Sequence, residues 1–397
     1  MRIIRINGVL STVLLAAGVV ASAQSSPPDQ QKLQAIFQSG SQAMHAGNAA
    51  AAEEQFRQAT RLAPGFAEAW LDLGLAQLKE GKLADAIPSM RQALALDPST
   101  HGAHLFLGIA EYQTHHGDDA LVDLGDAVQQ DPRNPLAQMW LGIVQLESGH
   151  PEKATEPLDR AAELSPDDIG ILDYRVQAHM AVARQSYTRI YQLDPGSWRL
   201  HRLNAQIDAE ARQHTQAIEE YQEAIKIAPK QADLYEGLGW EYRQTGQLDL
   251  AEKAFEQQLA LTPGNPIAMY NLASTRVDAG RAASAIGLLE QVVRLYGAPT
   301  VADYYLGRAY AAENKPEPAA AEYQKATTLG GETARQAWYG LGQVDKELGR
   351  TVEARAAVEK FQQLHQQAVQ ARAKDIQDWR KLNAAAETGP AAAPSPQ

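Results

Sequence analysis

The stretch AWLDLGLAQLKEGKLADAIPSMRQALALDP, residues 69–98, contains two runs of helical periodicity with a glycine between them. In each run apolar residues recur at steps of three and four, the spacing of one face of an α-helix. Gly81 interrupts the pattern, and Pro98 ends the second run because proline cannot continue a helix. The stretch therefore predicts two short helices joined by a tight turn. Neither helix can bury its apolar face alone, so neighbouring units must cover it.

The proline that closes this unit recurs along the chain at a nearly constant interval. Successive intervals are 34, 34, 34, 29, 34 and 34 residues. The prolines are Pro64, Pro98, Pro132, Pro166, Pro195, Pro229 and Pro263. A small residue recurs upstream with nearly the same spacing, at Gly40, Gly74, Gly108, Gly142, Ala205, Gly239, Ala273, Gly307 and Gly342. Repetition of this kind predicts a stack of two-helix units that share one continuous core.

One unit shows the residue pattern most completely. Its characteristic residues are Tyr235, Leu238, Gly239, Tyr242, Ala251, Phe255 and Pro263. They resemble the tetratricopeptide repeat family, whose pattern is W-x2-L-G-x2-Y, then A-x3-F, A and P. Ten units in this register can be counted between residues 33 and 365. The resemblance implies an all-α, right-handed α-solenoid superhelix of helical hairpins, with the first helix of each hairpin lining the concave face.

The unit between Pro166 and Pro195 is five residues shorter than its neighbours. Across its centre runs AHMAVARQSY, residues 178–187, with no Gly, Pro, Asn or Asp to make a turn. Two outcomes are open: a short hairpin with a very tight turn, or one helix of about 25 residues. We favour the short hairpin, because the packing residues of both helices remain. In either case the segment is interpreted as a joint between two arms.

The repeats divide the chain into seven expected segments. They are a signal peptide at 1–23, a disordered linker at 24–32, an N-terminal arm of four repeats at 33–166, a degenerate repeat that forms the joint at 167–197, a C-terminal arm at 198–351, a long capping helix at 352–386 and a disordered tail at 387–397. The capping helix is expected because the last unit of an array otherwise exposes its apolar face.

The composition restricts the function. With 48 acidic and 36 basic side chains the formal net charge is −12, which argues against a nucleic-acid partner because a phosphate backbone would be repelled. The chain has no cysteine, which excludes disulfides, thiol nucleophiles and cysteine-ligated zinc. No nucleophile elbow, zincin, P-loop or dinucleotide fingerprint is present. We therefore expect neither an enzyme nor a cofactor.

The first 26 residues, MRIIRINGVLSTVLLAAGVVASAQSS, are typical of an export signal. A basic start precedes an apolar core near residues 9–20, and a small-residue site predicts cleavage after Ala23. The core is about 12 residues long, short of the roughly 20 that cross a bilayer. An uncleaved interfacial anchor is the alternative. The segment predicts a periplasmic or secreted protein with no transmembrane span after cleavage.

The best metal candidate is HGAHLFLGIAEYQTHH, residues 101–116. Along a helix, however, His104 and His115 would lie about 16 Å apart, too far to share an ion. His104 also occupies the position of the family's tryptophan, which packs rather than binds. We expect no metal site.

The resemblance implies that ligand contacts come from five positions of each first helix. These positions define two zones. The apolar zone comprises Leu71, Leu75, Ile109, Tyr112, Met139 and Ile143. The tyrosine–arginine zone comprises Arg202, Trp240, Arg243, Tyr270, Tyr304, Arg308 and Tyr339. For the apolar zone, core packing and a partner surface are both open. The tyrosine–arginine zone favours binding, since tyrosine, tryptophan and arginine most often anchor interfaces.

These observations favour a non-catalytic scaffold or adaptor that binds a protein or peptide partner in its concave groove. In an exported compartment, such an adaptor would serve envelope assembly, secretion or complex maturation. Two alternatives remain at this point. One is a structural homo-oligomer, associating through the apolar zone or the last helix, and the other is a protein that binds glycans or small molecules.

Overall fold

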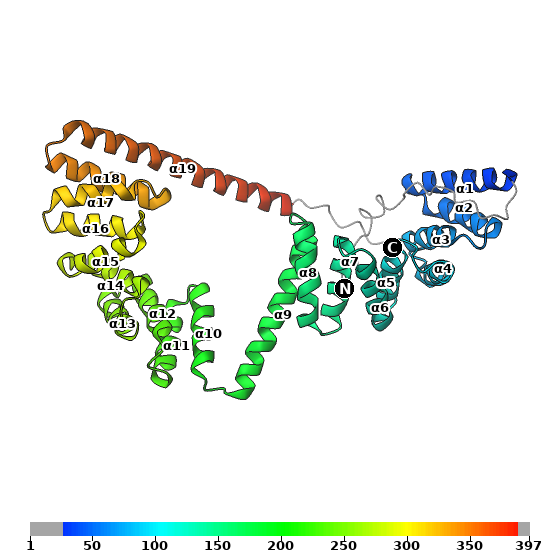
Figure 1. Cartoon of the computed structure of the whole chain (residues 1–397), viewed down its shortest axis with the longest axis horizontal. Helices are drawn as coiled ribbons and strands as arrows, with labels where there is room; N and C mark the ends of the chain where they lie inside the picture. The colour runs from blue at the N-terminus through cyan, green and yellow to red at the C-terminus, as the bar shows by residue number, and fades with distance from the viewer. Residues whose placement is uncertain (1–26, 388–397) are drawn as a thin grey trace. The chain divides into compact units, whose positions relative to one another are not determined.

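A computed structural model describes residues 27–387, and in that range the chain forms α-helices joined by short turns (Figure 1). No strand occurs between residues 27 and 387. The expected all-α class and the solenoid of paired helices are confirmed, and their arrangement fits the expected right-handed superhelix. The expected signal peptide and nearly all of the expected tail lie outside the described residues.

The helices fall into two compact units, one up to Arg189 and the other from Ile190 onward. The first contains α1 (Pro27–His45), α2 (Ala49–Leu62), α3 (Ala67–Lys79), α4 (Leu83–Leu96), α5 (Ala103–Gln113), α6 (Gly117–Gln130), α7 (Pro135–Glu147), α8 (Pro151–Leu164) and most of α9 (Ile169–Leu193). The second contains α10 (Trp198–Glu210), α11 (His214–Ile227), α12 (Ala232–Gln244), α13 (Leu248–Leu261), α14 (Pro266–Asp278), the 3-10 turn η2 (Ala282–Ser284), α15 (Ile286–Tyr296), α16 (Val301–Ala312), α17 (Pro316–Ala326), α18 (Gly331–Glu347) and α19 (Thr351–Glu387).

Within a hairpin, the recurring small residue lets the second helix approach the first. A Cβ atom placed on Gly74 would lie 2.7 Å from Cγ of Met90, and one on Gly239 would lie 2.5 Å from Cε1 of Phe255. Both partners are fully buried. In each case the large residue lies 16 positions after the glycine. This small–large pair is the central packing contact of the hairpin, and it explains why the small residue recurs with the repeat.

A second recurring position controls the turn between the two helices. Nine residues at this position have φ between 55° and 81°, in the left-handed region. They are Gly47, Gly81, His115, Gly149, Arg212, Gly246, Gly280, Asn314 and Gly349. Glycine adopts this conformation without steric cost, whereas a residue with a Cβ atom does so at a cost of about 1–2 kcal/mol. The hairpin therefore requires a left-handed residue at one place.

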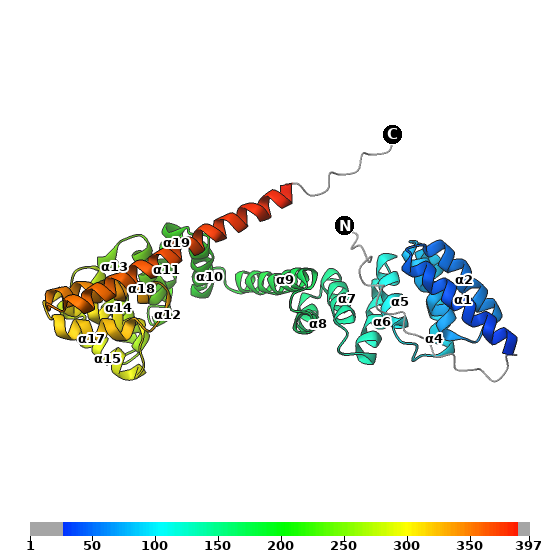
Figure 2. The ribbon, with the colours of Figure 1, turned by 90° about the horizontal axis from the view of Figure 1, so that it is seen from above.

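The shortened unit does not form a hairpin. Residues Ile169–Leu193 form the single uninterrupted helix α9, so the favoured short hairpin is wrong (Figure 1 and Figure 2). The physical reason is the turn: Ala183 stands seven residues after Val176, as Gly81 does after Gly74, and alanine continues a helix. Without the left-handed residue and the five missing residues, the chain has no place to reverse.

The first and last helices, α1 and α19, both extend beyond the bounds expected from the sequence. The segment 24–32 was expected to be disordered, but α1 begins at Pro27, where the fixed φ of proline suits a first helical turn. At the other end, α19 runs from Thr351 to Glu387, where a capping helix was expected. Only its first part packs on α18, with Ala354 and Ala357 buried. From His365 onward almost all of its described side chains are exposed.

None of the helices between residues 27 and 387 combines the length and apolar character needed to cross a membrane.

The turn position predicts a stabilising substitution. Arg212→Gly and His115→Gly should each raise the free energy of unfolding by about 1 kcal/mol, because glycine relieves the steric cost of positive φ. Denaturant unfolding followed by circular dichroism measures this. Arg212→Ala, which keeps the Cβ atom, serves as the control and should give no such gain. If Arg212→Gly and Arg212→Ala had the same free energy of unfolding, that result would contradict the role given to positive φ in the turn.

Candidate functional site

The tyrosine–arginine zone comes from successive first helices of the C-terminal unit. Arg202 lies on α10, Trp240 and Arg243 on α12, Tyr270 on α14, Tyr304 and Arg308 on α16, and Tyr339 on α18. The 34-residue repeat returns each first helix to the same orientation, which brings these residues to equivalent places on neighbouring helices. The guanidinium carbon of Arg243 lies 5.0 Å from the centroid of the Trp240 ring, within cation–π range.

The centre of the zone is a carboxylate shared by two arginines from different repeats. Arg243 donates to Asp278 over 2.6 Å, and Arg308 donates to its other oxygen over 2.7 Å. Arg243 also donates to the hydroxyls of Ser274 and Thr275, over 2.8 and 3.2 Å. The Arg243 side chain is 13% exposed and that of Arg308 32%. These charge-assisted bonds join α12, α14 and α16.

A tyrosine cluster lies directly beside this carboxylate. The Tyr305 ring centroid lies 5.7 Å from that of Tyr270 and 5.4 Å from that of Tyr304, both edge-to-face. The guanidinium of Arg308 lies over the Tyr305 and Tyr304 rings, at 5.1 and 5.7 Å. Burial raises the pKa of Tyr270 and of Tyr304, so both hydroxyls stay protonated and can donate hydrogen bonds.

The two ends of the zone differ from its centre. Arg202 donates to Asp233 over 3.0 Å and is separate from the shared carboxylate. Tyr339 is 47% exposed, and its ring lies 5.3 Å from that of Phe361 on α19. The structure thus joins Trp240, Arg243 and the residues near Asp278 into one cluster and leaves Arg202 and Tyr339 at its margins.

The apolar zone is largely core. Leu71, Leu75, Ile109 and Ile143 are each no more than 6% exposed, which favours core packing, one of the two interpretations that the sequence leaves open for this zone. All four belong to one core cluster, which contains residues from several neighbouring helices of the N-terminal unit. Tyr112 and Met139 are half-buried, and the Tyr112 hydroxyl donates to Glu147 over 2.5 Å.

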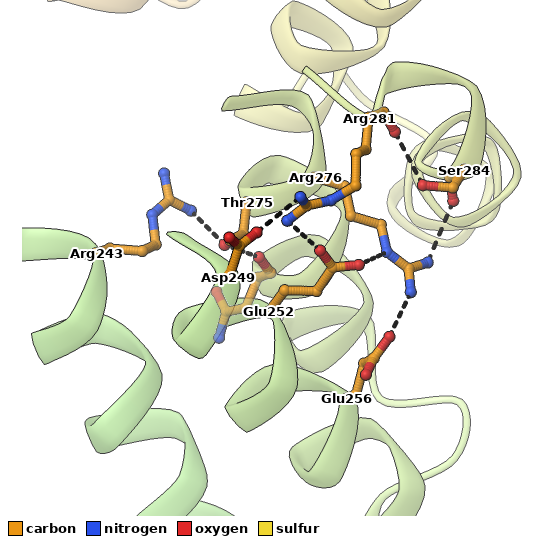
Figure 3. Close-up of polar contacts among 9 residues, drawn as sticks. Arg243, Asp249, Glu252, Glu256, Thr275, Arg276, Arg281 and Ser284 are labelled. Carbon is orange, nitrogen blue, oxygen red and sulfur yellow. Dashed lines mark hydrogen bonds and ion pairs between the residues drawn. The ribbon is translucent and has the colours of Figure 1, made fainter. Parts of the chain in front are cut away.

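An ion-pair network holds the second helix α13 to α14 in the same region (Figure 3). Arg276 donates to Glu252 over 2.7 Å and to Glu256 over 2.8 Å. Arg281 donates to Asp249 over 2.8 Å and also pairs with Glu252. Arg276 and Arg281 therefore already have carboxylate partners on α13. The network joins neighbouring helices and leaves little positive charge for a ligand.

One group between residues 27 and 387 has the composition of a metal site: His104, Asp123 and Asp126, with ligand atoms within 4.8 Å of one another. Nδ1 of His104 is already 2.6 Å from Asp123. The same two repeat positions hold His201 and Glu220, also 2.6 Å apart. A bond that recurs between the two helices of different hairpins is best explained as interhelical packing.

Two members of the cluster were missed at the sequence level, Asp278 and Tyr305. Asp278 ends α14, two residues before the left-handed Gly280, and an acid before a turn is typical of an exposed capping side chain. Tyr305 neighbours Tyr304 but lies outside the five positions that the family pattern implies. A usable signal existed for Asp278, since it is the only acid on α14.

Family models identify the repeats of this chain. Models described as tetratricopeptide repeat match residues 37–101, 71–135, 113–172, 171–232, 236–298 and 272–332. The chain belongs to the tetratricopeptide repeat family. Proteins of this family generally serve as protein-interaction scaffolds, and the two-helix units described above are its repeats.

Individual relatives share only parts of the repeat array. Superkiller protein 3 of Saccharomyces cerevisiae is 28% identical over 83 residues, which are 21% of this chain and 6% of that protein. Among solved structures, MamA from Desulfovibrio magneticus RS-1 is 21% identical, with a TM-score of 0.40, and the match covers 43% of this chain and 96% of that one. YrrB, described as a TPR protein with an unusual peptide-binding site, is 18% identical with a TM-score of 0.31, covering 54% and 95%.

Because two arginines share Asp278, its removal should lower the free energy of unfolding more than removal of Asp249. Asp278→Ala should lower the free energy of unfolding by about 2 kcal/mol, because two partly buried guanidiniums lose a charge-assisted bond. Asp249→Ala is the matched control: its side chain is 81% exposed, and such pairs contribute about 0–1 kcal/mol. Urea unfolding of both variants tests this. Equal losses would show that Asp278 does not join the repeats.

Proposed function

We propose that the chain is a non-catalytic scaffold that binds a protein or peptide partner along the first helices of its C-terminal unit. The observation that carries this proposal is the cluster around Asp278, where aromatic rings and two guanidiniums from a run of three consecutive repeats lie close together. Residues of these types supply large contact area and directed hydrogen bonds, which is why they dominate interface energies.

The charges of the cluster favour an acidic partner segment. Asp278 offers one negative charge to two guanidiniums, which leaves a local excess of one positive charge. Among the hydrogen bonds of the described residues, Arg308 uses only Nη1. A partner carboxylate, from a side chain or a chain end, can therefore bind its remaining donors while the rings of Tyr304 and Tyr305 contact the adjoining residue.

The proposed compartment is the periplasm or the exterior of the cell. Its support is the pattern of residues 1–26, with a basic start, a short apolar core and a small-residue cleavage site. The absence of cysteine from the chain means that folding there needs no disulfide formation. In that compartment the scaffold would act in envelope assembly, secretion or complex maturation.

Binding is tested by changing the cluster and comparing the captured partners. The variant Arg308→Gln/Tyr339→Ala, and a second variant replacing Tyr270, Tyr304 and Arg308 together, should lose partners that the wild type retains from periplasmic extract. The expected loss is about tenfold or more in affinity, since hot-spot residues cost about 2 kcal/mol or more when truncated.

The control for this experiment is Arg294→Gln/Tyr296→Ala on α15, where both side chains are exposed and away from the cluster. This variant should retain every partner. Thermal unfolding of each variant separates lost binding from lost folding. Unchanged capture by the cluster variants, with folding intact, would contradict the assignment of the site.

Export is tested by the mass of the protein recovered from its native host or from a periplasm-directed expression strain. The expected protein begins at Gln24, because cleavage follows Ala23. Substituting Ala23→Phe should block processing, because the site requires small residues. An intact protein with Met1 in the cytoplasmic fraction would contradict the proposed compartment.

A further inference from the structure

The distal segment of α19, residues 366–381, continues beyond the part of this helix that packs on α18. Among the described residues, the last hydrogen bond between the two helices is donated by Arg335 to Nδ1 of His365, over 3.1 Å. In the distal segment every side chain is exposed except that of Asp378, which is half-buried. Figure 1 and Figure 2 show this end of α19 extending past α18. The described part of the chain therefore leaves the segment open to a partner.

One face of the distal segment carries its large apolar side chains. At about 100° per residue, Val369 and Trp379 lie roughly 20° and 60° around the helix axis from Ile376. Val369 is 54% exposed, Ile376 45% and Trp379 63%. Tryptophan combines an apolar ring with an N–H donor, so it is enriched where an apolar layer meets water.

The same face carries two positive charges. Arg372 and Arg380 each lie about 40° from Ile376, one on either side of it. Both side chains are exposed. The acidic residues lie farther round the helix, with Asp375 about 100° and Asp378 about 160° from Ile376. The apolar side chains are therefore flanked by guanidiniums, and the carboxylates are placed to the side and behind.

The distal segment is basic in an acidic chain. It contains four basic and two acidic side chains, whereas the whole chain has a formal charge of −12. Within the described range its one ion pair joins Lys381 to Asp378 over 3.3 Å, so Arg372 and Arg380 have no carboxylate partner there. An apolar face with unpaired arginines favours a partner surface that is apolar inside and anionic outside.

A second copy of the chain does not supply such a surface through this helix. In a parallel pair of distal segments Arg372 would oppose itself, and in an antiparallel pair centred on Ile376 it would oppose Arg380. Either arrangement brings like charges together beside an apolar contact, which is destabilising.

We propose that the distal segment of α19 lies on the surface of a membrane that contains anionic lipids. The side chains of Val369, Ile376 and Trp379 enter the boundary between head groups and acyl chains, as in other interfacial amphipathic helices. The guanidiniums of Arg372 and Arg380 reach the lipid phosphates, because long basic side chains can extend from an apolar face to a charged layer.

The acidic remainder of the chain does not prevent this contact. Trp379 lies about 21 Å beyond His365 along the helix, and the Debye length is about 8 Å at physiological ionic strength. Repulsion between the lipids and the rest of the chain is therefore largely screened. The segment would hold the C-terminal unit at a membrane. This inference does not depend on the proposed partner site, because the distal segment contains no residue of the Asp278 cluster.

Cosedimentation with vesicles tests the proposal. The protein used is the chain from Gln24 onward, which contains every described residue and lacks the apolar residues 9–20. It should bind vesicles of phosphatidylcholine with about 30% phosphatidylglycerol roughly tenfold more tightly than vesicles of phosphatidylcholine alone. Raising the salt to about 0.5 M should weaken this binding, because the charges are screened over a shorter distance.

Two variants separate the apolar from the charged contribution. Trp379→Ser should weaken binding to the anionic vesicles about tenfold or more, because the largest inserted side chain is lost. Arg372→Gln/Arg380→Gln should weaken it by a similar factor and remove most of the preference for anionic vesicles. Circular dichroism and thermal unfolding should be unchanged in both, since these side chains are exposed.

The controls match each variant in residue type. Tyr296→Ser removes an exposed aromatic side chain on α15 and should bind like the wild type. Lys374→Gln/Lys381→Gln removes the same charge from the opposite side of α19, about 160° and 140° from Ile376, and should lose less affinity than the arginine variant.

A single introduced thiol tests which face contacts the lipid, because the chain contains no cysteine. A polarity-sensitive fluorophore on Ile376→Cys should shift its emission to the blue on anionic vesicles. The same fluorophore on Lys374→Cys, about 160° around the helix, should shift much less because it stays in water.

Several results would overturn the proposal. They are a wild type that does not bind anionic vesicles, equal binding to both kinds of vesicle, unchanged binding by Trp379→Ser, equal losses in the arginine and lysine variants, and equal emission shifts at the two labelled positions. If the wild type binds no vesicle but retains a purified acidic protein that Arg372→Gln/Arg380→Gln releases, the face belongs to a protein partner and the membrane proposal fails.

Discussion

A left-handed residue at one position of the turn is the constraint on which the helical hairpins depend. Each hairpin reverses the chain within a few residues, and the residue that does so has positive φ whether it is a glycine, Arg212, His115 or Asn314. Once the chain has reversed direction, the small residue of the first helix lies against the large residue 16 positions later on the second helix. Each stacked hairpin then presents its first helix in the same orientation, which places residues 34 apart in the sequence next to one another.

The same constraint explains why the chain is divided. In the shortened unit the turn is absent, and the helix continues from Ile169 to Leu193. The boundary between the two compact units falls within this helix. The N-terminal unit uses its first-helix positions mainly for core packing, through residues such as Leu71 and Ile143. The C-terminal unit leaves aromatic rings and guanidiniums partly open around Asp278, and the proposed binding site lies there.

Most of the fold could be predicted from the sequence, because the proline interval and the helical periodicity are backbone requirements visible in residue types. The joint could not, because Ala183 and Tyr187 keep the packing pattern of a second helix while the turn that would use it is missing. The packing residues alone favour a hairpin, whereas the backbone geometry of the turn decides the outcome. In the candidate site, the first-helix positions located the tyrosines and arginines. The role of Asp278 depends on two guanidiniums from other repeats, a relation between helices that no single repeat contains.

The continuous helix at the joint is the central claim, and a distance measurement across it tests the claim most directly. Spin labels on Asp173→Cys and Gln192→Cys, in a chain without other cysteines and diluted with unlabelled protein, report one intramolecular distance by pulsed electron resonance. A continuous helix places the two residues about 28 Å apart, at 1.5 Å per residue. A closed hairpin would bring them to about 10 Å, the spacing of packed helices, and that result would contradict the account.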